Sequence, residues 1–349
     1  MDNHINHNCT LILPVRKGGA QLRKCLKAIT AGTVVPEIVI MDCTSEKGAL
    51  DQIRNSFPSV RIFDMGMNPG RAHAVNTGIH ITKTPYVCVL APRILVGRHC
   101  IERMLAAMEK NKNLMSVQAK ILASEDTERI SGAGWNLSAD AASFVRGQGA
   151  KAFHYRKRAM VLAAQLDACL FRMEALETVG ILDERFYSRL EDLDLGYRGC
   201  MAGFDNLYEP SAVCREMESE RSSDFYRQME IGNQIYFRYK HGLGDPGKAL
   251  RSLLHRKDPG YETAVQRGAM LCFQAEMEMM ERTELAMTVT KQTLPEEFCM
   301  EVKDEAVRKV FPLYLGERSE ASPADIPDLL KMRLRMAVGT ADRIRNLLR

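Results

Sequence analysis

The sequence lacks three features that would place it in familiar functional classes. Its ten cysteines include no C-x-x-C pair and no Cys/His cluster at ligand spacing, which argues against zinc and favours buried thiols in a reducing compartment. It has a single tryptophan, and 48 basic against 44 acidic residues leave a net charge of +4, so no basic, aromatic-rich patch points to nucleic acid. No apolar run approaches the ~18 residues that a transmembrane helix needs.

The N-terminus is also poor in apolar residues. Residues 1–8 are polar and lack the hydrophobic core of a signal peptide. The longest apolar candidate, residues 159–171, is short and contains Gln165 and Asp167. Together with the unpaired cysteines, these features predict a cytoplasmic protein, with at most peripheral contact at the inner face of the cell membrane.

The first half of the sequence alternates short apolar runs with helical patterns. The runs expected to form strands cover residues 9–15, 37–43, 60–64, 86–91, 114–119 and 161–171. Two short strands are expected further along the chain, near residues 206–209 and 212–214. Helical spacing separates most of them, which predicts an α/β fold with a mostly parallel sheet covered on both faces. Ligands bind beyond the carboxyl ends of such strands, so the segments after Val15, Asp42, Asp64 and Leu90 should line one crevice. The first strand is not followed by G-x-G-x-x-G, which argues against a dinucleotide-binding oxidoreductase.

Two regions depart from this alternation. Residues 120–158 are rich in glycine and weakly periodic, and they predict a loop-rich insertion with a short hairpin. From about residue 218 the pattern is helical, with candidate helices at 225–241, 261–290 and 326–349. We therefore predict a sheet domain over 1–217 and a helical region over 218–349. The last helix is basic and amphipathic, which leaves an anionic membrane surface and a protein surface open as partners.

The strongest chemical signal is an acidic segment that opens a helical pattern. Glu191, Asp192 and Asp194 lie in its first turn, and Gly203 is expected to end the helix. Acidic side chains at this place complement the helix dipole. Alternatively, one of them serves as a general base for a hydroxyl group.

Several short motifs follow one another along the chain, at residues 13–15, 40–45, 68–79, 167–176, 179–186, 191–195, 232–233 and 240–241. The first is the end of the first strand, and the others are similar, in order, to V-D-N-x-S, N-x-G-x-A-x-A-x-N-x-G-I, G-A-x-x-x-x-R-x-x-x-L, V-G-x-F-D-E-x-F, E-D-x-D-L and R-N…K-H. This series resembles family 2 glycosyltransferases, particularly the rhamnosyltransferase-like branch, whose GT-A fold binds nucleotide sugars. The motifs run from about Thr10 to His241, and their specificity comes from the shared order.

The resemblance implies an inverting transfer from a nucleotide-diphosphate sugar to a saccharide or lipid-linked acceptor in polysaccharide assembly. It suggests Asp192 as the general base, with Glu191 or Asp194 raising its pKa through like-charge repulsion. The positions that it assigns to nucleotide-sugar binding are Pro14, Val15, Arg16, Asp42, Arg71, Asn76, Pro92 and Arg93. For Arg71, an exposed helix arginine is the alternative.

The metal-binding positions depart from the family pattern. Family members end the strand before residue 91 in a motif whose last Asp holds Mg²⁺ or Mn²⁺, but here Arg93 takes that place. The family's second ligand, a histidine after the strand near Val213, falls at Arg215 or Glu216. A guanidinium repels a cation. The resemblance therefore implies a metal cofactor for which this sequence offers no ligand.

This departure leaves two hypotheses. In the first, the Arg93 guanidinium replaces the metal and stabilises the departing diphosphate, with Arg16, Lys17 and Arg71 adding positive charge. In the second, the chain is an inactive relative that acts as a binding or scaffold partner of another transferase.

Overall fold

The computed structural model describes residues 5–43, 48, 50–124, 126–138, 143–218 and 224–243, with residues 267–268, 270–272 and 274–275. The chain divides into two compact units, Met1–Tyr226 and Arg227–Arg349. The expected boundary between 217 and 218 stays a prediction. The expected helix at 326–349, and most of the one at 261–290, lie outside the described residues.

The first unit is built on a ten-stranded sheet with the order β10-β12-β6-β11-β4-β1-β2-β3, to which β5 and β7 add at β12 and β6. The strands are β1 (Ile5–Val15), β2 (Val35–Asp42), β3 (Arg61–Asp64), β4 (Tyr86–Leu90), β5 (Ile94–Val96), β6 (Leu114–Leu122), β7 (Ile130–Gly132), β10 (Ala159–Val161), β11 (Ala168–Arg172) and β12 (Asp205–Glu216). Strands β3, β2, β1 and β4 are parallel, and β11 runs antiparallel to β4 and β6. The predicted α/β class, with a mostly parallel sheet, is confirmed.

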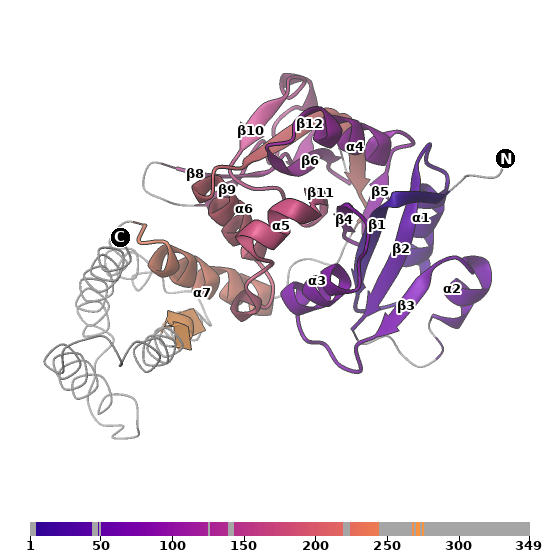
Figure 1. Cartoon of the computed structure of the whole chain (residues 1–349), viewed down its shortest axis with the longest axis horizontal. Helices are drawn as coiled ribbons and strands as arrows, with labels where there is room; N and C mark the ends of the chain where they lie inside the picture. The colour runs from indigo at the N-terminus through magenta and orange to yellow at the C-terminus, as the bar shows by residue number, and fades with distance from the viewer. Residues whose placement is uncertain are drawn as a thin grey trace, which may run out of the picture. The chain divides into compact units, whose positions relative to one another are not determined.

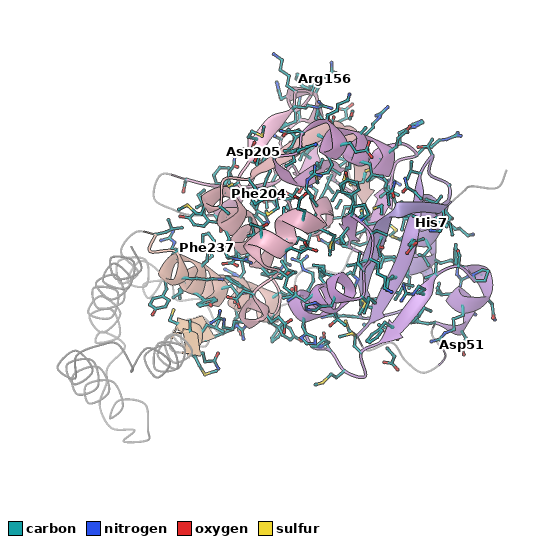
Figure 2. The ribbon with its side chains drawn as sticks, viewed as in Figure 1. His7, Asp51, Arg156, Phe204, Asp205 and Phe237 are labelled. Carbon is teal, nitrogen blue, oxygen red and sulfur yellow. The ribbon has the colours of Figure 1, made fainter. Side chains whose placement is uncertain are left out.

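Helices cover both faces of this sheet, as Figure 1 shows for α1, α2 and α3 around β1 to β3. One face carries α1 (Ala20–Thr30), α2 (Asp51–Ser56) and α4 (Cys100–Lys110), and the other carries α3 (Arg71–His80), α5 (Met173–Val179) and α6 (Glu191–Met201). Side chains alternate between faces along a strand. Leu11 and Leu13 accordingly pack in one core, and Ile12 packs in the other. Side chains fill both layers (Figure 2).

The structure corrects two strand predictions. Residues 161–171 do not form one strand: β10 ends at Val161 and β11 begins at Ala168. Backbone hydrogen bonds to side chains elsewhere in the fold explain the break. The Gln165 N–H donates to Gln118 Oε1 at 2.5 Å, and the Leu166 N–H donates to Asp192 Oδ2 at 3.0 Å. Conversely, the two short strands expected near 206–214 form the single strand β12, which is irregular between residues 209 and 213.

The expected insertion contains the short antiparallel hairpin of β8 (Trp135–Leu137) and β9 (Ser143–Val145), followed by the 3-10 turn η1 (Ala152–His154). A second 3-10 turn, η2 (Glu184–Phe186), precedes α6. Helix α7 (Asp224–Lys240) leads into the second unit, where Gly268 lies so near Gly232 that a Cβ would be 2.9 Å from its carbonyl oxygen. Within the described part of the chain, every helix is too short or too polar to cross a membrane.

Candidate active site

Four parallel strands end at one edge of the sheet. Val15 at the end of β1 pairs with Asp42 at the end of β2, and Asp42 pairs with Asp64 at the end of β3. Strand β4 lies on the other side of β1 and ends at Leu90. The residues at or directly after these ends include the expected donor-binding positions Pro14, Val15, Arg16, Asp42, Pro92 and Arg93.

A carboxylate and two guanidiniums form the centre of this edge. Asp167, just before β11, accepts from Arg71 Nη1 at 3.2 Å and lies 2.8 Å from Arg93 Nη2. The other side of Arg93 binds Glu216 at the end of β12, with Nε and Oε1 2.8 Å apart. Glu216 is held in turn by the Ser131 hydroxyl at 2.6 Å. Burial raises the pKa of Asp167, but the neighbouring arginines lower it more, so this carboxylate stays ionised.

Arg71, the first residue of α3, joins this cluster to the acidic helix α6. Its Nε donates to Glu191 Oε1 at 2.5 Å, and its Nη2 lies 3.9 Å from Asp192 Oδ2. Burial lowers the pKa of Arg71, but Glu191, Asp167 and Asp192 raise it above the ordinary value. Arg71 is therefore not the exposed helix arginine of the alternative interpretation. Its side chain is only 22% exposed and links three carboxylates.

Asp192 is a buried carboxylate with a raised pKa. Its side chain is 3% exposed, and its two oxygens accept from the backbone N–H groups of Leu166 and Leu193. Burial, followed by repulsion from Glu191, raises the pKa of Asp192 from 3.8 to about 6. Asp194 is not among these causes, so Glu191 is the neighbour that fits the expected like-charge effect. Glu191 is fully buried, and its Oε2 makes no hydrogen bond.

A strained loop delivers α6 to this place. Tyr187, Arg189 and Leu190 have φ values of 60°, 78° and 66°, a conformation that costs about 1–3 kcal/mol for each non-glycine residue. The start of α3 holds the loop: Ala72 donates its N–H to the Tyr187 carbonyl at 3.0 Å. Gly70 allows this contact, because a Cβ there would lie 2.5 Å from the Tyr187 ring. The strain is concentrated directly before Glu191 and Asp192.

Two expected site residues have contacts that point to structural roles. Asp194 is fully buried and accepts from Arg198 Nε at 2.9 Å, one helical turn further on. Asn76 is 2% exposed, and its amide both donates to the Leu182 carbonyl and accepts from the Leu182 N–H, at 2.9 and 3.1 Å. A second donation goes to Glu184. Asn76 therefore fastens the loop before α6 to α3, and its expected contact with the nucleotide stays a prediction.

Arginines also gather on the outer side of the edge. Arg16, directly after β1, is exposed, donates a hydrogen bond to the Tyr226 hydroxyl and lies 5.4 Å from the centre of that ring. The Arg189 guanidinium lies 5.6 Å from the same ring centre. Arg189 also contributes to lowering the pKa of Asp167. Positive charge from two distant segments thus meets at the Tyr226 ring.

The side chains at the family's metal positions do not fit a divalent cation. Arg93 stands at the first position, and the nearby carboxylates of Asp167 and Glu216 both bind its guanidinium at 2.8 Å. Divalent cations need several oxygen or imidazole ligands. Over the described ranges, His, Cys, Asp and Glu side chains form no group of three that could hold a metal ion. We therefore assign no chemistry here to a metal.

Asp167 was not predicted from the sequence as a site residue. A signal was present, because Asp167 occupies the position of glycine in the family's G-A pattern, just as Arg93 occupies that of aspartate. The structure shows that these two departures compensate each other in one ion pair. Glu216 was named only as a replaced metal ligand, and its pairing with Arg93 depends on β12 lying beside β5.

Comparisons with known proteins give one family match and several structures of similar fold. The family model described as Glycosyl transferase family 2 matches residues 10–178. No curated protein matches the chain in sequence. Among solved structures, GalNAc-T7 with UDP, GalNAc and Mn²⁺ is similar, with a TM-score of 0.52 and 14% identity over 71% of this chain and 56% of that chain. The mannosyltransferase PcManGT from Pyrobaculum calidifontis, in complex with GDP-Man and Mn²⁺, has a TM-score of 0.50 and 15% identity over 94% of this chain and 86% of that chain.

At these identities the solved structures show a shared fold, and the chain spans little more than half of GalNAc-T7. That fold is the GT-A arrangement, with strand ends that meet at one edge. The family match covers most of this sheet, from β1 to α5, and ends before α6 and β12. Residues 10–178 thus match glycosyl transferase family 2 in sequence, and the chain shares the GT-A fold of two solved glycosyltransferases.

Proposed function

We propose that the chain transfers a sugar, with inversion, from a nucleoside diphosphate donor to a hydroxyl of a saccharide or lipid-linked acceptor. The state of Asp192 is the main support. A general base works best when its pKa lies near the working pH, and burial with repulsion from Glu191 raises the pKa of Asp192 to about 6. A purely structural carboxylate at a helix start would gain nothing from this shift.

In the proposed step, the acceptor hydroxyl oxygen attacks the anomeric carbon as the bond from that carbon to the diphosphate oxygen breaks. The hydroxyl proton passes to Asp192, and the nucleoside diphosphate leaves with the electron pair of the broken bond. Attack from the face opposite the leaving group inverts the anomeric centre. The groups must be held in line, which fits a base fixed by two backbone N–H donors.

The leaving diphosphate needs positive charge, which we assign to arginines instead of a metal ion. In the central cluster, the carboxylates of Asp167, Glu191, Asp192 and Glu216 outnumber the guanidiniums of Arg71 and Arg93. Arg93 alone is therefore too strongly compensated to balance a diphosphate. We propose that Arg93 contacts the diphosphate directly, and that Arg16, Lys17 and Arg189 supply the remaining charge.

The direct test is turnover with UDP-, GDP- and dTDP-sugars, assayed with EDTA in place of added metal. We expect the rate with EDTA to equal the rate with Mn²⁺, because a guanidinium stands where the family's metal ligand is expected. Metal content should be measured in the same samples as the control. A rate that disappears with EDTA and returns with Mn²⁺ contradicts the metal-independent step.

A second prediction concerns the pH dependence. The wild-type kcat/KM should rise with pH around a midpoint near 6, because Asp192 must lose its proton to act as a base. Glu191→Gln should move this midpoint to lower pH, because it removes the like charge that helps to raise the pKa of Asp192. Glu177→Gln, an exposed carboxylate on α5, is the matched control and should leave the midpoint in place. An unmoved midpoint in Glu191→Gln would contradict the pairing.

One observation favours the second function, a non-catalytic partner of another transferase. The carboxylates of the central cluster outnumber its guanidiniums, which disfavours the binding of a diphosphate there. This alternative predicts no turnover with any donor, but co-purification with an active transferase from native cells. The rhamnosyltransferase-like branch and a role in polysaccharide synthesis also stay predictions, to be decided by the donor and acceptor found.

A further inference from the structure

The only tryptophan of the chain, Trp135, lies beside the proposed base. It begins β8, and its backbone is fixed on both sides: its N–H donates to the Ala163 carbonyl at 2.8 Å, and its carbonyl accepts from Leu162 at 3.0 Å. Ala163 packs against α6, since a Cβ on Gly196 would lie 2.1 Å from it. The backbone of Trp135 is therefore held in a fixed relation to the helix that carries Asp192.

The indole N–H of Trp135 lies near the Asp192 carboxylate, since Trp135 is among the groups that lower the pKa of Asp192. The indole Nε1 is buried and makes no well-aligned hydrogen bond. Trp135 as a whole is only partly buried.

This combination has a specific chemical use. Sugar rings present a flat face of C–H groups, which packs well on the electron-rich face of an aromatic ring, and hydroxyl groups around the edge. An indole next to a general base can hold a sugar ring by its face while one edge hydroxyl reaches the base. We propose that Trp135 is the platform of the acceptor site, on which a saccharide ring stacks with its reacting hydroxyl directed at Asp192.

This inference rests on the proposed function and makes it more specific. It commits the acceptor to a sugar ring at the reacting end, whether that sugar is free or carried by a lipid. It also gives the insertion at 120–158 a role, because β8 and β9 bring the platform to α6. The expected hallmark is an effect on the acceptor that is separate from any effect on the donor.

Fluorescence gives a readout that does not require turnover. With excitation where tyrosine does not absorb, all emission from the full-length protein comes from Trp135, the only tryptophan. Methyl α- and β-glycosides of glucose, galactose, mannose and rhamnose are the probes, titrated in the presence of UDP, GDP or dTDP. We expect a saturable change in emission with at least one glycoside. No change with the whole set would overturn the proposal.

Kinetics provide the second measurement. Trp135→Ala should raise the acceptor KM by about tenfold or more, the loss expected for an aromatic contact, and leave the donor KM unchanged. Trp135→Phe keeps a flat ring and should restore part of the affinity. The matched control is Phe144→Ala on the same hairpin: Phe144 is 44% exposed and neighbours Val145, the residue paired with Trp135, so it points to the opposite face.

The outcomes separate this inference from the function on which it rests. Wild-type turnover with equal acceptor KM values for Trp135→Ala and Phe144→Ala removes the platform and leaves the transferase intact. A raised donor KM in Trp135→Ala places the ring on the donor side and also overturns the inference. If the wild type shows no turnover but a glycoside changes the emission, the proposed function fails while saccharide binding at Trp135 stands.

Discussion

Asp192→Asn is expected to lower kcat by about 10²–10⁴-fold, the range that a positioned general base contributes. Asparagine has nearly the same shape and can still accept the Leu166 N–H that Asp192 Oδ2 accepts at 3.0 Å. It cannot take a proton from the acceptor hydroxyl. Donor affinity, measured by titration of the nucleoside diphosphate, should not change, because the defect lies in the chemical step.

The same substitution should have the opposite effect on stability. The pKa of Asp192 is raised in the folded protein from 3.8 to about 6, so ionisation of this carboxyl disfavours folding. The contribution of the neutral carboxyl is complete below about 3.8 and is lost as the pH rises through about 6. Asp192→Asn should therefore match the wild type in acid and melt at a higher temperature than the wild type above pH 6.

The pair of measurements distinguishes a base from a structural carboxylate. Loss of kcat together with a higher melting temperature is the trade-off expected at an active site. Glu177→Gln, with its exposed side chain on α5, controls for the loss of a negative charge and should change neither quantity. Normal turnover by Asp192→Asn would remove Asp192 from the mechanism.

The sequence predicted the sheet well because local periodicity carries that information. Side chains alternate along β1, so Leu11 and Leu13 pack in one layer and Ile12 packs in the other. A strand that is buried on both faces therefore appears in the sequence as a continuous apolar run. The same rule failed at 161–171. There the backbone N–H groups of Gln165 and Leu166 donate to the side chains of Gln118 and Asp192 and not to a neighbouring strand. These partners are distant in the sequence, so no local pattern predicts them.

The site could be predicted only in part, for a related reason. The different role of Asp194 could be predicted from the sequence, because Asp194 and Arg198 are four residues apart and form the ion pair that this spacing favours in a helix. The structural role of Asn76 could not be predicted, because its partner Leu182 is 106 residues away. Contacts of that kind depend on how α3 and the loop before α6 meet in the fold.

Paired departures from the family pattern carry more information than single ones. Considered alone, Arg93 in place of an acidic ligand is consistent with two states: a guanidinium that replaces the metal ion, or a site that has lost its activity. Asp167 in place of glycine, 2.8 Å from the Arg93 guanidinium, shows that the new charge has a dedicated partner. A decayed site has no need for such a partner, so the pair favours an active arrangement in which the guanidinium is held in a fixed position.

Arg93→Ala is expected to lower kcat by about 10²–10³-fold, the loss measured when one preorganised group that stabilises transition-state charge is removed. The substitution also leaves Asp167 and Glu216 without the guanidinium that each binds at 2.8 Å, and their negative charge would then oppose the departing diphosphate. Arg93→Lys should recover little, because an ammonium cannot present the two-sided fork that spans both carboxylates. Steady-state kinetics with donor and acceptor varied separately provide the measurement.

The matched control is Arg158→Ala, which breaks a comparable arginine–carboxylate pair with Glu209 outside this cluster. If both alanine variants lose activity and melting temperature equally, Arg93 acts through stability alone.

A sharper comparison is Arg93→Asp combined with Glu216→His, which restores the ligand types of the family pattern. If the guanidinium stands in for the metal, this double variant should be inactive with EDTA and regain turnover with Mn²⁺. Activity that no metal restores, in a variant that still folds and binds the donor, would mean that Arg93 does not act in place of the ion.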